Sequence, residues 1–380
     1  MTPRSTGSSR DWTGTLVPLV LVIGLVADGA SRFLSLDVLA IRAWEAMSRN
    51  AFMEGGVPFE PSKHYVNDRS SGDLAAATNQ PAFREYRREE FTSDAWGYRN
   101  ATTFAPDNPP DAILVGTSFS VGSGVSDDET LAAQLGRLTH SRIYNAAGGA
   151  PVPERIRSIA ERLGMKKGTV ILELLESNGV PGSPPPTPRL HQVCMSRLGT
   201  RCLTLKGWLR ASPVKIATQR AYRKLENDLW LPNPSANTVS VHRFPEGDAM
   251  LIPPGTNFRC RADSEEGAVT FFRSLQAGLP GLDLFVVLVP EKASVYGDPL
   301  SLVAPSERCL THMGRALASL SIPYVDLSDR LRDAARAETS PGHRLFFLDD
   351  THWNRFGIGT AATMIALHWP TERQDAAKAP

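Results

Sequence analysis

The run Asp111-Ala112-Ile113-Leu114-Val115-Gly116 decides the fold of this chain. Two prolines precede its apolar centre and a glycine ends it, which is typical of a short buried strand. Residues 127–129 are all acidic and open an amphipathic helix over residues 131–138, because negative charge is favoured in the first turn of a helix. The unit is therefore a strand, a loop and a helix.

The same alternation continues along the chain. Further apolar strands are expected at residues 142–145, 169–175, 284–289 and 324–327. Helices are expected behind Pro153, over residues 268–277 and 306–320, and from Gly357 onward. Apolar strands that alternate with helices predict an α/β fold, with a parallel sheet covered by helices on both faces.

The sequence outside this alternation divides into further segments. Residues 34–108 begin with an expected helix over residues 34–47 and continue as polar sequence with weak periodicity, which indicates an N-terminal extension. The α/β domain is predicted to cover residues 109–370, and a short tail of residues 371–380 follows it.

An insertion is predicted at about residues 178–263, where the alternation is interrupted. It is either a lid or substrate platform or a simple decoration. Its basic and aromatic stretch, residues 206–230, predicts a helix. That helix would meet a polysaccharide or a membrane surface, or it would pack by its aromatic face.

Residues 1–33 predict an export signal. Arg4 and Arg10 precede an uncharged run over residues 12–27. Its apolar centre is short for a bilayer span of roughly 20 residues, which favours a cleaved signal peptide over an uncleaved membrane anchor. Positive charge retains the N-terminal end in the cytoplasm, so both alternatives place the body in the periplasm or at the extracytoplasmic face, secreted or anchored.

Composition excludes some functions. The 380 residues carry 41 Lys+Arg against 40 Asp+Glu, a formal net charge of +1. Proteins that bind nucleic acid usually carry a clustered basic face, so we predict no nucleic-acid partner. The four cysteines lack the tight spacing with nearby histidines that a metal site needs, and we predict no metal and no cofactor.

Ser118 is the candidate nucleophile. It directly follows the first strand and precedes a helix, and Gly116 would let the chain turn sharply there. The ligand crevice of an open parallel sheet lies at the strand carboxyl ends, and a helix start offers backbone N–H groups to a developing oxyanion. The alternative is a serine without a function at a strand end.

Asp350 and His352 are the candidate acid and base. They lie near the other end of the chain, in Asp350-Thr351-His352-Trp353. An acid two residues before a histidine could orient the imidazole and hold its tautomer, which leaves the other ring nitrogen to take a proton from Ser118. The alternative for His352 is a capping or packing role.

Together these blocks resemble the SGNH (GDSL-type) hydrolase superfamily, particularly its AlgX/AlgJ-like branch linked to O-acetylation of alginate and other exopolysaccharides. Residues 113–120 are similar to the nucleophile block, with Thr117 where many members have Asp. Asp350-Thr351-His352-Trp353 matches the Asp-x-His-Trp signature, and residues 290–296 are similar to the branch's Pro-x-Lys-x-x-x-Tyr stretch. The resemblance covers residues 111–367 apart from the insertion and implies a three-layer α/β/α domain.

The order of the blocks departs from the alginate proteins. In those proteins the Asp-x-His-Trp block precedes the serine, whereas here Ser118 comes first, as in ordinary SGNH hydrolases. Ordinary members use Asp-x-x-His, so Asp349 competes with Asp350 as the orienting acid. The match at Trp353 favours Asp350.

Further site residues are implied by the resemblance alone. The oxyanion would be stabilised by backbone N–H groups of Ser118 and of Gly149 or Gly148, and by the side chain of Asn178, for which a turn-forming role is the alternative. Lys292, Tyr296 and Trp353 would contact the substrate or shape the site. The alternatives are a solvated lysine and a packed tyrosine.

The resemblance and the export signal together imply serine-dependent acyl transfer, through acyl-Ser118, to an exopolysaccharide or a cell-envelope glycan. A membrane-bound O-acyltransferase would supply the acetyl groups. The alternatives are an esterase or acetylesterase, and a polysaccharide-binding assembly protein without catalysis.

Overall fold

The computed structural model describes residues 13–31, 37–48, 58–79, 81–178, 213–229, 239–253, 264–297, 309–338 and 342–369. It divides into two compact units. One comprises Met1–Ala40 and Arg189–Leu225, and the other comprises Ile41–Pro188 and Glu226–Pro380. The strands of the predicted α/β domain all lie in the second unit, together with residues 41–108 of the expected extension.

A five-stranded parallel sheet forms the centre of the second unit. Its strands are β3 (Ala112–Val115), β4 (Ile143–Asn145), β5 (Gly168–Leu175), β8 (Leu282–Val289) and β9 (Tyr324–Asp326), in the order β4-β3-β5-β8-β9. Because β3 pairs with both β4 and β5, the strand order reverses beside β3. In open α/β sheets such a switch point is where ligands bind.

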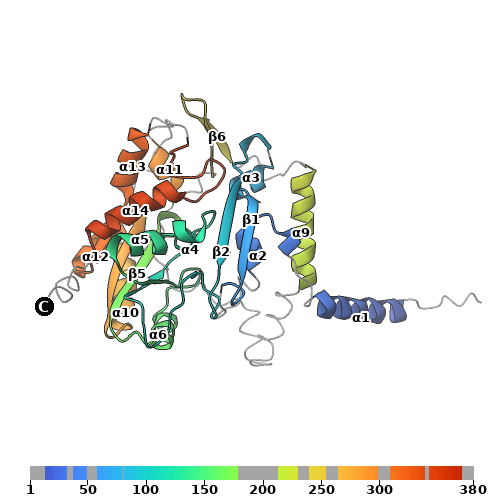
Figure 1. Ribbon diagram of the computed structural model, residues 1–380, viewed down its shortest axis with the longest axis horizontal. Coiled ribbons are helices and arrows are strands. Elements are labelled where there is room, and N and C mark those ends of the chain that lie inside the picture. Colours follow the sequence, from blue (N-terminus) through green and yellow to red (C-terminus); the bar gives the residue numbers. More distant parts are fainter. Residues whose placement is uncertain are drawn as a thin grey trace, which may run out of the picture. The chain divides into compact units, whose positions relative to one another are not determined.

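Helices cover both faces of this sheet (Figure 1), which confirms the predicted α/β/α fold. On one face lie α5 (Leu131–Thr139), α13 (Ser328–Ala337) and α14 (Arg355–Leu367). On the other lie α6 (Pro153–Arg162), α10 (Ser264–Ala277) and α12 (Cys309–Ser319).

Strand β3 shows why its sequence forms this core. Successive side chains of a strand point to opposite faces, and Leu114 joins the apolar cluster with α5 and α14, whereas Ile113 and Val115 join the cluster with α6. All four residues of β3 are buried. A strand buried on both faces is apolar throughout, which is why the run was recognisable in the sequence.

Residues 41–108 form structure that the weak periodicity did not predict. An antiparallel pair, β1 (His64–Ser70) and β2 (Arg87–Thr92), encloses α3 (Asp73–Thr78) and η2 (Pro81–Phe83). Phe91 of β2 packs in one apolar cluster with Met47, Val121 and Ala147. The pair therefore packs against the segments that follow β3 and β4, and Figure 1 shows β2 beside α4 (Ser118–Val121).

The expected helix over residues 34–47 is wrong as one element. The described part contains η1 (Asp37–Leu39) and a short α2 (Ala43–Met47). Arg42 between them has an extended backbone, with φ −128° and ψ 153°, so the helix is interrupted there.

The remaining elements are short or lie outside the sheet. A second antiparallel pair, β6 (Ser240–Arg243) and β7 (Ala249–Ile252), lies within the expected insertion and contributes Met250 and Ile252 to the core. The other short elements are η3 (Asp127–Glu129), η4 (Glu176–Asn178) and α11 (Lys292–Tyr296). The helix α9 (Pro213–Asp228) lies within the stretch expected to be helical.

In the first unit, the predicted export segment forms α1 (Thr13–Ser31). Within the described ranges of the chain, a search for helices with the length and apolar character of a membrane span finds none. The predicted tail, residues 371–380, lies outside the described residues.

Candidate active site

Ser118 lies where the first sheet strand ends. Strand β3 ends at Val115, and Ser118 is the first residue of α4. Thr117 is the N-cap of this helix, and its hydroxyl accepts a hydrogen bond from the Phe119 N–H. The half-buried Ser118 side chain therefore stands at a helix start on the carboxyl edge of the sheet.

Glu173 supports this turn from the neighbouring strand β5. Its carboxylate accepts hydrogen bonds from the Thr117 N–H at 2.6 Å and the Thr117 hydroxyl at 2.9 Å. Burial raises the pKa of Glu173, and the bonds from Thr117 oppose that rise. A Cβ at Gly116 would collide with the same carboxylate, so this glycine is required for space rather than for a positive φ.

Ser118, His352 and Asp350 are joined in one chain of hydrogen bonds. The Oγ of Ser118 is 2.7 Å from the Nε2 of His352, and the Nδ1 of His352 is 2.5 Å from an Oδ1 oxygen of Asp350. The same oxygen accepts the backbone N–H of His352 at 3.0 Å. The structure thus brings together the three residues that the sequence singled out as nucleophile, base and acid.

Electrostatics favour a charged acid beside the histidine. Burial alone would raise the pKa of Asp350, but the charges of His352, Arg87 and Arg42 hold that pKa well below its ordinary value. Burial alone would lower the pKa of His352, but the Asp350 charge and hydrogen bond raise it on balance. An ionised Asp350 stabilises the imidazolium that forms when His352 accepts a proton.

The structure distinguishes the two competing acids. Asp349 is fully buried but turns away from the imidazole. Its carboxylate accepts the N–H groups of Gly72 at 2.7 Å and Glu85 at 3.0 Å, and it pairs with Arg87 at 2.8 Å. Asp350 is therefore the acid that faces His352.

The predicted oxyanion donors differ in their availability. The N–H of Gly148 donates to the Gly116 carbonyl at 3.0 Å, so the expectation that Gly148 offers a donor is wrong. Within the described residues, the N–H groups of Ser118 and Gly149 have no hydrogen-bond acceptor. The side chain of Asn178 lies outside the described part of the chain.

The three predicted substrate contacts are buried instead. Lys292 and Tyr296 are both 0% exposed, and Trp353 is 1% exposed. The expectation that they touch a substrate is wrong because no surface of these side chains is available to one.

All three side chains hold the segment that carries the acid and the base. The ammonium group of Lys292 donates to the carbonyls of Leu251, Phe347 and Asp350 at 2.7 to 2.8 Å. The hydroxyl of Tyr296 accepts the Leu345 N–H at 2.8 Å. The indole of Trp353 donates to the Phe119 carbonyl at 3.2 Å and so joins the histidine segment to α4.

Other residues near the site were missed by the sequence analysis. Arg42, Asp73 and Arg87 come from the expected extension and contact the acid segment, and Asp73 accepts both the N–H and the hydroxyl of Thr351. No pattern in residues 41–108 pointed to them. Glu173 did carry a signal, because a single acid within an otherwise apolar strand must find buried partners.

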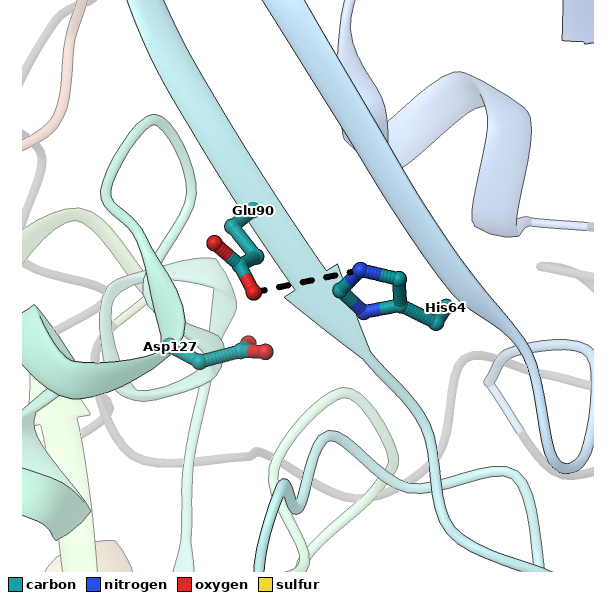
Figure 2. A group of neighbouring side chains, drawn as sticks. All are labelled: His64, Glu90 and Asp127. Atoms are coloured by element: carbon teal, nitrogen blue, oxygen red, sulfur yellow. Dashed lines mark ion pairs between the residues drawn. The ribbon is translucent and has the colours of Figure 1, made fainter.

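Two groups of described residues bring three possible metal ligands together. Asp73, Asp350 and His352 form one, whose atoms make the hydrogen bonds given above. His64, Glu90 and Asp127 form the other, shown in Figure 2.

The second group is an ion-pair network. His64 lies 3.8 Å from Glu90, which also pairs with Arg88 at 3.0 Å. Asp127 pairs with Arg99 at 3.0 Å. Both carboxylates therefore already have cationic partners, and we assign this group a role in joining β1 and β2 to η3 rather than in binding metal.

The five-stranded parallel sheet with helices on both faces is consistent with an SGNH-like α/β/α fold. Residues 251–380 match the family model described as the SGNH hydrolase-like domain of acetyltransferase AlgX, which confirms the predicted resemblance over that range. The matched range contains Asp350 and His352 but not Ser118. In general terms, the match supports a domain of the acyltransferase and esterase class.

Comparisons with whole proteins add little. A search of curated proteins finds no match. One crystal structure has 12% identity and a TM-score of 0.35, and the alignment covers 68% of this chain and 95% of that one. The structure of protein YXIM from Bacillus subtilis has 12% identity and a TM-score of 0.33, over 76% of this chain and 60% of that one. We draw no argument from likeness at this level.

Proposed function

We propose that this chain transfers acetyl groups to a carbohydrate outside the cytoplasm through an acyl-Ser118 intermediate. The observation that carries the proposal is the hydrogen-bonded chain from Ser118 through His352 to Asp350, with heavy-atom distances of 2.7 and 2.5 Å. A nucleophile, a base and an acid that orients the base are the parts that such chemistry needs.

The first half-reaction forms the acyl-enzyme. His352 Nε2 takes the proton of Ser118 as its Oγ bonds to the acyl carbonyl carbon, and Asp350 stabilises the resulting imidazolium. The backbone N–H groups of Ser118 and Gly149, which have no acceptor within the described part of the chain, would donate to the oxyanion. When the tetrahedral intermediate collapses, the bond to the donor's alkoxide breaks and His352 gives that oxygen the proton.

The second half-reaction is the same chemistry in the reverse direction. A sugar hydroxyl gives its proton to His352 and attacks the acyl carbon, and the ester bond to Ser118 breaks. Ser118 then regains the proton from the imidazolium. Water in place of the sugar would complete an ester hydrolysis, so the exclusion of water and the position of the acceptor decide the outcome.

Two observations support transfer to an extracytoplasmic glycan. The matched family model is described as the SGNH hydrolase-like domain of an acetyltransferase. The N-terminal sequence, with Arg4 and Arg10 before an uncharged run, has the pattern of an export signal or anchor. The proposed acceptor is an exopolysaccharide or cell-envelope glycan, and the proposed acetyl source is a membrane-bound O-acyltransferase.

The second candidate function is an esterase or acetylesterase. The order of the blocks favours it, because Ser118 precedes His352 as in ordinary SGNH hydrolases. Purified protein supplied with p-nitrophenyl acetate, with and without an acetyl-accepting oligosaccharide, separates the two. Acetylated oligosaccharide that accumulates faster than free acetate supports transfer, and acetate alone supports hydrolysis. If neither product forms, a non-catalytic polysaccharide-binding role replaces both.

A further inference from the structure

We infer that Arg87 is a positioning residue for the acid–histidine pair, which fixes Asp350 and sets the pH range in which His352 works as a base. The inference rests on the proposed function. Arg87 belongs to β2, outside the sheet that carries the predicted site residues.

The guanidinium of Arg87 is held from several sides. It donates to the carbonyls of Glu85 at 2.9 Å and Gly124 at 3.1 Å. Its central carbon lies 3.7 Å from the centre of the Phe347 ring. The side chain is only 12% exposed. A planar guanidinium held in this way presents its remaining N–H groups in fixed directions.

Those remaining N–H groups reach the acid segment. Arg87 pairs with Asp349 at 2.8 Å and with the Oδ2 oxygen of Asp350 at 3.2 Å. It thus links the two adjacent acids to Gly124, which lies shortly after α4. One side chain therefore joins the histidine side of the site to the serine side.

The two oxygens of Asp350 have separate partners. Oδ1 faces His352, whereas Oδ2 faces Arg87, the backbone N–H of Asp73 at 3.1 Å, and Arg42 at 3.8 Å. Because a carboxylate is planar, partners that fix Oδ2 also fix the direction of Oδ1. All three partners on the Oδ2 side come from residues 41–108.

The positive charge of Arg87 should affect the pKa of His352, which can be measured. Four charged groups surround the imidazole, namely Asp350, Asp73 from α3, Glu291 before α11, and Arg42. Lys292 and Asp349 are further charged groups that lie beside Asp350. Removing Arg87 would remove a positive charge that offsets Asp350. The imidazolium would then be more stable, and the pKa of His352 would rise further. A role in packing alone would lower the rate without this displacement along the pH axis.

The test uses the full chain with Arg87→Met, Arg87→Lys and a matched control, Arg88→Met. Arg88 is the next residue of β2, its side chain is 56% exposed, and it pairs with Asp68 and Glu90 rather than with the acid segment. The rate constant for modification of Ser118 by phenylmethanesulfonyl fluoride is measured from about pH 5 to pH 9, around the ordinary pKa of histidine. The midpoint of this profile does not depend on how much of a variant is folded.

Arg87→Met is expected to move the midpoint upward by roughly half to one pH unit and to lower the rate near neutral pH roughly tenfold. The midpoint for Arg87→Lys should lie between those of Arg87→Met and the wild type, because an ammonium keeps the positive charge but not the planar arrangement of N–H donors. Arg88→Met should match the wild type. Equal midpoints for Arg87→Met and Arg88→Met would overturn the inference and leave the proposed function standing. A wild type that the reagent does not modify at Ser118 would overturn both.

Discussion

Ser118 and His352 are separated by 234 positions in the sequence, and the hydroxyl of one lies 2.7 Å from the imidazole of the other. Ser118 lies just after β3, at the carboxyl edge of the sheet. His352 lies in the loop before α14, and this loop reaches the same edge. The indole of Trp353 stabilises this contact between the two segments, because it donates a hydrogen bond to the Phe119 carbonyl in α4.

Replacing Ser118 by alanine should abolish acyl transfer without unfolding the protein. The side chain is half-buried and, among the residues that the structure describes, makes its hydrogen bond only to His352, so its removal leaves the α4 backbone in place. We expect turnover of p-nitrophenyl acetate to fall by roughly 10⁴-fold or more. Ser319→Ala, at the end of α12, is the matched control and should retain full activity. Comparable turnover in the two variants would contradict the nucleophile assignment.

The activity should fall on the acid side with a midpoint above that of an ordinary histidine. His352 must be neutral to accept the Ser118 proton, and its pKa is raised from 6.5 by Asp350 even though burial opposes the rise. Below the midpoint, kcat/KM should drop about tenfold per pH unit. The pH dependence of kcat/KM measures this directly.

The same pH dependence of kcat/KM should be measured for Asp350→Asn. This substitution should displace the midpoint of that profile to lower pH and reduce the rate by roughly 10⁴-fold, because the imidazole loses both its charge partner and its fixed tautomer. An unchanged midpoint in this variant would show that Asp350 does not control the histidine.

The protonation of His352 also affects stability. Its pKa in the folded protein is raised, so the group stabilises the fold below its unfolded pKa, and that stability is lost as the pH rises through the folded value. Because the proposed reaction needs a neutral His352, we expect activity in the pH range where this contribution to stability is being lost. Urea denaturation of wild type and His352→Gln across the same pH range would show the difference.

Lys292→Met should destabilise the protein strongly. The ammonium is fully buried and donates to four backbone carbonyls, three of them at 2.7 to 2.8 Å, and these would lose that donor. We expect a loss of roughly 3 to 5 kcal/mol in the free energy of unfolding near neutral pH, measured by urea denaturation. Lys166→Met, on an exposed side chain, should change it little.

The effect of Lys292 should also depend on pH. Burial lowers its pKa from 10.5 to about 8. Between these values the unfolded chain keeps a proton that the folded protein has released, so the stability of the wild type rises with pH relative to the variant. The gap between wild type and Lys292→Met should widen as the pH rises through this range. A gap that narrows instead would mean that the folded lysine keeps its proton.

Gly116→Ala tests the close contact beneath the nucleophile. The added methyl group would collide with the Glu173 carboxylate and displace the turn that carries Ser118. We expect a loss of about 1 to 3 kcal/mol in stability and a fall in kcat. Gly267→Ala in α10 is the control. No atom lies within 4 Å of its added carbon, so it should stabilise the helix by about 0.5 to 1 kcal/mol. Equal behaviour of the two variants would remove Glu173 from the description of the site.

Much of the sheet domain could be predicted from the sequence. Strands such as β5 and β8 are buried on both faces, and they therefore appear as unbroken apolar runs. Ser118, Asp350 and His352 could be selected because each stands in a short block at a strand or helix boundary. The parallel sheet explains the place of Ser118, because the carboxyl ends of its strands lie at one edge. Asp350 and His352 lie in the loop between α13 and α14, and only the fold shows that this loop reaches Ser118.

The support of the site could not be predicted in the same way. Arg87 and Asp349 are separated by 262 positions, and no local pattern shows that two such charges will pair. Lys292 shows a second limit. A motif can indicate that a lysine matters, but only the fold shows whether its ammonium faces a substrate or the backbone of its own chain.

The contacts of Asp349 and Asp350 also define how much of the chain is needed to build the complete site. A fragment that begins at residue 109 would keep every strand of the sheet, yet it would lose Arg42, Asp73 and Arg87. Asp349 and Asp350 would both lose Arg87, and Asp350 would also lose Arg42 and the Asp73 N–H, so the direction of its carboxylate toward His352 would no longer be fixed. The sheet domain and residues 41–108 must therefore be inherited, exchanged or transplanted together.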